Sequence, residues 1–561
     1  MSAVPSVLPY LNEYPFKGNL SPVTEKPAWL VEMIHRNDQN VGRIRQRRID
    51  DQNDPRFGAV LDGVEIATPH AVTGFLKAGI CSWVSPESEW YGDKVLLREL
   101  TSSAAFLVKL QHQDGTIDLV TTNFHSTPDT AFLVKYLCPV YGLLEKSEDK
   151  EKDQLVEYLK EFLQNAGNAL VVGGIHTPNH RWVVCAALAG LHMLWPNPEY
   201  VRRAETWLAE GIDLDENGQY QEKSSYIYSS LSDRVLIHTS RGFAKPELLD
   251  YVRKNLEMTF YYIHPNGEIV TEASGRQDNS IIGTLENYYY PYRYLAIKDQ
   301  NAYFAAACRL IESTALSKTT GFLQYFLEDD TLWQELPEAA KLPVNYFKHF
   351  ENSALVRVRR GDYDASILPS NTAFFTFHKG NAILQGVRLA SAFFGKGQFV
   401  ADEYQVEEGR TTMISELEAP YYQPFPKERV VGDGVWENMP KNERPQSEIQ
   451  KLRTTIVVSE VEEGFELDIR VEGTERVPLA IELIFRPGGE FESVSTHESL
   501  QDAYFLKEAF GKYILNGEYI EFGPALHEHK WIAIRGALPK MDAPTVYLTG
   551  FTPFNHKIRI S

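Results

Sequence analysis

Polar side chains that could move protons or hold a carboxylate gather in four short segments of the N-terminal half. These segments contain Asn123, His125 and Asp129, then His176, Asn179, His180 and Arg181, then Glu222, Tyr226 and Tyr228, and finally Arg276. Imidazole, carboxyl and phenol groups serve as general acids and bases, while amide and guanidinium groups stabilise developing negative charge. We therefore expect acid–base chemistry where a fold brings these segments together.

Other kinds of chemistry lack their motifs. The sequence has no Gly-rich phosphate loop after a strand, no HExxH and no GxSxG, which argues against nucleotide binding, zinc proteolysis and serine hydrolysis. His176 and His180 are separated by Thr177-Pro178 at a predicted helix start, so they do not form a ready-made metal pair. We expect no metal in the site and no cofactor, while a structural divalent metal in the C-terminal half stays open.

Each candidate also has a structural explanation. Asp129 and Asn179 fall just inside predicted helix N-termini, where capping alone accounts for such residues. Tyr226 and Tyr228 point to different faces of a helix, so we expect at most one to be catalytic. Arg276 could serve only to pair with Glu272 or Asp278. His378 follows a Phe-rich stretch at a predicted strand end and could be structural.

A repeat of about 50 residues positions the candidate segments. Thr127-Pro128-Asp129 recurs as Thr177-Pro178-Asn179, and each begins an apolar periodic run typical of a helix. Gly-containing turns precede the helix starts at a similar rhythm, namely Asp114-Gly115, Asn217-Gly218 and Asn266-Gly267. The repeating unit is thus helix, turn, extended loop and helix. Because equivalent loops of such a ring arrive at one rim, the four segments should converge.

Two architectures follow one another along the chain. Helical patterns cover 94–113, 153–165, 198–210, 246–262, 279–297, 302–313 and 321–333, which predicts an incomplete α/α toroid. Beyond Lys341 the pattern alternates, and short runs from 354–359 to 557–560, including 530–533, predict an antiparallel β-sandwich. The predicted domains are an N-terminal extension (1–60), the toroid (61–340) and the sandwich (341–561). The acidic, Pro-rich stretch 407–450 is interpreted as a long loop.

Bulk composition limits the partners. The formal net charge is −20 with no visible basic patch, so we expect no nucleic-acid partner. Aromatic residues make up 12% of the chain, and their flat faces suit stacking on sugars. Cys81, Cys138, Cys185 and Cys308 lie far apart, Met1 to Tyr14 lacks a signal-peptide pattern, and no apolar stretch approaches a membrane span. We therefore expect no membrane partner and a cytoplasmic location; the oligomeric state stays open.

The motifs resemble those of the heparinase II/III-like superfamily of polysaccharide lyases. Asn179-His180 stands at an inner helix start, and the stretch Glu216-Asn217-Gly218-Gln219-Tyr220-Gln221-Glu222-Lys223-Ser224-Ser225-Tyr226 is similar to the family's acidic-Gly-x-x-x-Glu-x-x-x-Tyr pattern. Asn266-Gly267-Glu268-Ile269 leading to Arg276-Gln277-Asp278 is a weaker likeness. The resemblance implies an α/α toroid with antiparallel sheets and an enzyme that cleaves uronate glycans by β-elimination.

In such a reaction a base removes the C5 proton of a uronic acid and the O4 glycoside leaves. By this resemblance His180 is the expected base and Tyr226 the expected acid. Asn179 is the candidate for the group that neutralises the uronate carboxylate, with His125, Asn123 or Arg181 assisting. One tyrosine in both proton-transfer roles is an open alternative. Substrate-binding roles are expected for Asn123, His125, Asp129, Arg181, Glu222, Tyr228, Arg276 and His378.

Uronate-containing oligosaccharides or polysaccharides are therefore the expected partner, and rhamnose–glucuronate units are one example. The acidic net charge favours short substrates over long polyanions. Three alternatives stay open: a glycoside hydrolase using paired carboxylates such as Asp129 and Glu222, a uronate C5-epimerase, and a non-catalytic glycan-binding protein.

Overall fold

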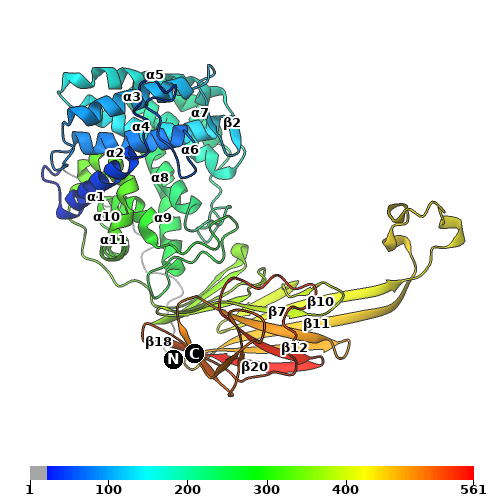
Figure 1. Cartoon of the computed structure of the whole chain (residues 1–561). Helices are drawn as coiled ribbons and strands as arrows, with labels where there is room; N and C mark the ends of the chain where they lie inside the picture. The colour runs from blue at the N-terminus through cyan, green and yellow to red at the C-terminus, as the bar shows by residue number, and fades with distance from the viewer. Residues whose placement is uncertain (1–21) are drawn as a thin grey trace. The chain divides into compact units, whose positions relative to one another are not determined.

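The chain folds into a helical unit and a β unit (Figure 1). The computed structural model describes residues 22–561, so Met1 to Tyr14 and the start of the predicted N-terminal extension lie outside the described residues. The helical unit ends at Pro343, and the β unit comprises Val344–Ser561 together with His264–Asn266. This order of a helical part followed by antiparallel sheets confirms the predicted fold class.

The described residues of the helical unit contain twelve α-helices. They are α1 (Ala28–Arg45), α2 (Pro69–Val84), α3 (Lys94–Leu110), α4 (Thr127–Glu145), α5 (Asp153–Val172), α6 (Pro178–Leu194), α7 (Pro198–Leu208), α8 (Tyr228–Gly242), α9 (Leu248–Thr259), α10 (Tyr289–Asp299), α11 (Ala302–Thr314) and α12 (Leu323–Glu328). Within residues 22–561, none of these helices combines the length and apolar character that crossing a bilayer requires.

Helices of the unit form an inner and an outer layer. The inner helices α2, α4, α6, α8 and α10 pack on one another in chain order, and each also packs against an outer helix. Every residue from Trp182 to Leu191 of α6 is buried, whereas the outer helix α5 buries one stripe that includes Leu155, Leu159 and Phe162. Burial on all sides is expected of a helix enclosed by neighbours.

Glycine turns join the outer helices to the inner ones, as the repeat predicted. Gly115, Gly218 and Gly267 have φ angles of +83°, +91° and +84°, which L side chains rarely adopt. A Cβ on Gly115 would lie 2.1 Å from the Asn165 carbonyl oxygen, and one on Gly218 would lie 2.5 Å from that of Lys254. At these two turns the backbone therefore needs glycine both for its conformation and for close packing on an outer helix.

The helical pattern differs from the prediction in several places, and helices α1 and α2 were not predicted. The helix expected over 279–297 begins only at Tyr289, after a loop and the short 3₁₀ helix η3 (Leu285–Tyr288). Helix α8 was not predicted, because its buried face is rich in polar residues and lacks an apolar period. Several of those polar groups are satisfied internally: the Tyr220 hydroxyl donates to Asp233 Oδ1 at 2.9 Å, and Thr239 Oγ1 donates to the Val235 carbonyl at 2.8 Å.

The β unit is a sandwich of two sheets. One has the order β14 (Glu490–Glu492), β17 (Gly511–Leu515), β18 (Glu518–Gly523), β20 (Phe554–Ile560), β12 (Gly464–Gly473), β11 (Gln446–Val461), β10 (Arg410–Tyr422) and β9 (Glu403–Glu407). The other has the order β15 (Val494–Thr496), β16 (Ala503–Leu506), β19 (Thr545–Phe551), β13 (Pro478–Phe485), β7 (Ala382–Ser391), β6 (Phe375–Lys379), β5 (Tyr363–Ile367), β4 (Leu355–Arg360) and β3 (Asn345–Phe350), with β8 (Gly397–Gln398) beside β7. Pairing is antiparallel except between β16 and β19, and side chains of both sheets share one hydrophobic core.

The prediction of a long loop over 407–450 is wrong at both ends, and a loop with short 3₁₀ turns covers only 423–445. Strands β10 and β11 pair from Arg410 with Ser459 out to Tyr422 with Gln446, and Figure 1 shows the pair, in yellow, running out to a loop. Lys451 pairs with Glu418 across the two strands at 3.1 Å. Charged residues on an exposed ribbon hid the alternation that marks a half-buried strand. No strand forms over 530–533, which was also predicted as one.

Candidate active site

Asn179 and Glu222 form the centre of the candidate site, at the start of α6. The backbone N–H and the side-chain Nδ2 of Asn179 both donate to Glu222 Oε1, at 3.0 and 2.8 Å. Thr177, at the N-cap, makes no side-chain capping bond, so an acceptor from the following repeat satisfies a free donor of this helix end. Asn179 is only 3% exposed, which holds its amide in one place.

Arg276 and Tyr228 extend this group. Arg276 Nε forms an ion pair with Glu222 Oε2 at 3.5 Å, and its guanidinium lies over the Tyr228 ring, 5.1 Å from the centroid. Gln277 Nε2 donates to the Tyr228 hydroxyl at 2.6 Å. The structure thus joins residues of the second, third and fourth predicted segments through direct contacts.

Charge at Glu222 is balanced by its neighbours. Burial raises the pKa of the Glu222 carboxyl above its ordinary value, while the Asn179 donors and the positive charge of Arg276 oppose that rise. The carboxylate accepts bonds from Asn179 on one oxygen and faces Arg276 with the other. Glu222 therefore orients both the amide and the guanidinium.

His180 lies next to Asn179 and is largely buried. Its ring meets His176 edge-on at 4.8 Å and Phe132 at 6.0 Å. Burial lowers the pKa of His180 to about 4, with a further lowering by His176 and a partial opposition by Asp129. The imidazole is therefore neutral at pH 7 and has a lone pair that can accept a proton.

Tyr226 and Tyr228 face different partners. The Tyr226 hydroxyl donates to Glu286 Oε1 at 2.8 Å, and burial together with Glu286 raises the pKa of this phenol far above its usual range. Asp278 Oδ2 accepts from the backbone N–H of Tyr226 at 3.1 Å, so Asp278 shapes the turn before α8. Glu286 was not predicted, because it lies in an aromatic run that is typical of a buried helix.

Residues of the first predicted segment line a hollow near the start of α4. The hollow has a volume of about 430 Å³ and is lined by Asn123, Phe124, His125 and His176, among others. Asn123 Nδ2 and Ser126 Oγ donate to Asp129 Oδ2 at 2.9 and 2.5 Å. Ser126 in turn accepts from the Asp129 backbone N–H at 3.2 Å. Asp129 therefore takes part in the capping of α4.

His125 and Arg181 are engaged away from Asn179. His125 is 59% exposed, its ring stacks on His112 at 3.8 Å, and its Nδ1 lies 2.7 Å from Asp114 Oδ2. Arg181 pairs with Glu210 at 3.2 Å and with Asp213 at 3.5 Å. The expected role of Arg181 beside Asn179 therefore has no contact to support it.

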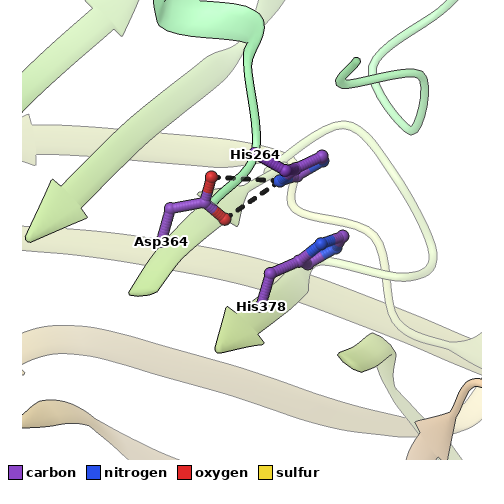
Figure 2. Close-up of side chains that lie close together, drawn as sticks. All are labelled: His264, Asp364 and His378. Atoms are coloured by element: carbon purple, nitrogen blue, oxygen red, sulfur yellow. Dashed lines mark hydrogen bonds and ion pairs between the residues drawn. The ribbon is translucent and has the colours of Figure 1, made fainter. Parts of the chain in front are cut away.

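His378 belongs to a separate group in the β unit, shown in Figure 2. His264 Nδ1 lies 3.0 Å from both oxygens of Asp364, and the rings of His264 and His378 stack at 3.7 Å. All three side chains are buried, and one ligand atom of each lies within 4.8 Å of the others. Two imidazoles and a carboxylate match the donors that zinc prefers. His264 was missed because it lies far from Asp364 and His378 in the sequence and no motif joins them.

Comparison with known proteins shows the fold. No family model and no curated protein sequence matches the chain. Heparinase III superposes with a TM-score of 0.56 at 11% identity, covering 97% of this chain and 86% of the other. Chondroitin AC lyase of Streptomyces coelicolor A3 gives 0.56 at 13% (97% and 80%), and Paenibacillus xanthan lyase gives 0.53 at 10% (95% and 56%). The chain therefore has the heparinase- and chondroitinase-like polysaccharide lyase fold.

Proposed function

We propose that this protein is a polysaccharide lyase that cleaves a uronate-containing glycan by β-elimination. One observation carries the proposal: a neutral imidazole, His180, adjoins an amide and a guanidinium that Glu222 holds together. This group lies at the start of an inner helix, in a fold shared with heparinase III and chondroitin AC lyase.

The proposed reaction begins at the uronate carboxylate. Asn179 and Arg276 would donate to it, which stabilises the negative charge that develops when the C5 proton leaves; one such donor contributes about 3 kcal/mol. His180 takes the C5 proton, the electron pair forms the C4–C5 double bond, and the C4–O4 bond breaks. A tyrosine gives its proton to the departing O4 oxygen, leaving an unsaturated uronate and a new chain end.

Tyr228 is the better candidate for this tyrosine. Its ring lies under Arg276, which also pairs with Glu222, so it shares the group that contains Asn179. The Tyr226 hydroxyl already donates to Glu286. Tyr226, the acid expected from the sequence, is thus the second candidate. The variants Tyr228→Phe and Tyr226→Phe distinguish the two.

Glycan units on one side of the cleaved bond would occupy the hollow lined by Asn123, Phe124, His125 and His176. Phe124 is 66% exposed and offers a face on which a sugar ring can stack. Short rhamnose–glucuronate oligosaccharides are a substrate class to try first.

The group of His264, Asp364 and His378 fits a structural zinc ion. Arg357 Nη2 lies 2.5 Å from Asp364 Oδ2, so one carboxylate oxygen is shared with a guanidinium. A bound ion would tie strands β5 and β6, which carry Asp364 and His378, to the segment of His264. No step of the proposed reaction uses it.

The test is incubation with a panel of uronate oligosaccharides, read by ultraviolet absorbance and mass. A conjugated double bond without uptake of water supports the lyase. Tyr228→Phe should abolish turnover while substrate still binds, and Tyr226→Phe should retain activity. Cleavage with uptake of water and no absorbance would instead indicate a hydrolase, and epimerisation would leave chain length unchanged.

A further inference from the structure

A second hollow lies at the opposite ends of the inner helices. Its volume is about 620 Å³, and it is lined by the ends of α2 and α4, the loops that follow them, Lys26 before α1 and Trp333 after α12. Asp129 stands at the other end of α4, which spans Thr127–Glu145 and is therefore about 28 Å long. The hollow is thus separate from the candidate active site.

Three aromatic residues line this hollow. Tyr91 is 58% exposed, whereas Trp83 is 2% exposed and forms a fixed wall. Trp333 is anchored because its Nε1 donates to the Phe326 carbonyl at 2.6 Å, and the Lys26 ammonium lies 5.3 Å from its ring centroid. Aromatic faces of this kind pack against the C–H faces of pyranose rings.

The polar lining contains both signs of charge. Lys26 and Lys146 supply donors, and Glu148 and Asp149 supply acceptors. Lys26 is already paired with Glu87 at 3.0 Å. Hydroxyl groups both donate and accept, so a neutral sugar can bond to groups of either charge, whereas an anion would meet the two carboxylates.

We infer that this hollow is a second, non-catalytic binding site for neutral pyranose units of a glycan. Its volume is in the range of small-ligand pockets. The inference does not depend on the elimination chemistry proposed above, because it rests on the lining of this hollow alone.

Cellobiose is the probe, and binding to the full chain is followed by saturation-transfer NMR and by tryptophan fluorescence. We expect a Kd on the order of 1 mM, weakened about tenfold by Tyr91→Ala. Tyr251→Ala is the matched control, since Tyr251 is 38% exposed on α9 and does not line the hollow. Circular dichroism checks that both variants are folded.

Absence of cellobiose binding, or equal weakening by both variants, would overturn the inference. Binding that Asn179→Ala removes and Tyr91→Ala leaves intact would also overturn it, because the sugar would then occupy the candidate active site. Turnover of short uronate substrates should be unchanged in Tyr91→Ala. Loss of cellobiose binding and loss of lyase activity are therefore measured separately, and one proposal can fail without the other.

Discussion

The proposed reaction should keep its kcat/KM at pH values well below the pKa of an ordinary histidine. The base form of His180 is the neutral imidazole, and burial lowers its pKa to about 4. At pH 5 an imidazole with a pKa of about 6.5 keeps roughly 3% of its base form, whereas one with a pKa of about 4 keeps roughly 90%. The expected difference in kcat/KM at pH 5 is therefore about 30-fold.

Initial rates of ultraviolet absorbance at low substrate, from about pH 4.5 to 8, measure this. Circular dichroism at each pH confirms that the chain stays folded. A kcat/KM that falls tenfold per pH unit below about 6.5 would refute the reasoning, because it would mean that the base is an ordinary exposed histidine.

The same burial links His180 to stability. Its folded pKa lies below its unfolded one, so the unfolded chain binds more protons and stability falls as the pH drops from about 6.5 to about 4. The full difference corresponds to about 3 kcal/mol. His180→Gln should flatten this part of the pH dependence, and an unchanged dependence would contradict the assignment.

Three further outcomes are expected. Glu222→Gln should lower kcat/KM roughly 10- to 100-fold, because it weakens the contact that holds the Asn179 amide. The control Glu210→Gln should leave kcat/KM unchanged, and similar losses in both variants would count against a positioning role of Glu222. Gly218→Ala should cost more unfolding free energy than the roughly 1–2 kcal/mol expected of Gly267→Ala. A Cβ on Gly218 would lie 2.5 Å from a carbonyl oxygen, whereas one on Gly267 would meet no atom within 4 Å, and equal losses in denaturant titrations would contradict this. Metal analysis should find zinc that a chelator removes with a Tm loss of about 5 °C, and Asp364→Asn should bind none.

Much of the fold could be predicted because its signals are local. Pro at helix starts and glycine turns recur along the repeats, and Gly115 and Gly218 have the conformation that those turns require. Helix α8 could not be found this way, since its buried face is polar and part of it is satisfied by residues outside the helix, such as Tyr220 for Asp233. The β10–β11 ribbon was hidden by its charged, exposed faces.

The sequence predicted which residues belong to the candidate site, but not which of them contact one another. The candidates Asn179, Glu222 and Arg276 do meet. Glu286 and His264 were missed because each acts through a contact with a residue remote in the chain. Pairing of this kind is set by tertiary packing, which a single sequence does not display.

The bond from Asn179 to Glu222 spans 43 positions and two consecutive repeats. An isolated helical hairpin could not make this bond, because the Glu222 acceptor belongs to the next repeat. A truncated ring that lacks the repeat of Glu222 should therefore lose the contact that fixes the Asn179 amide.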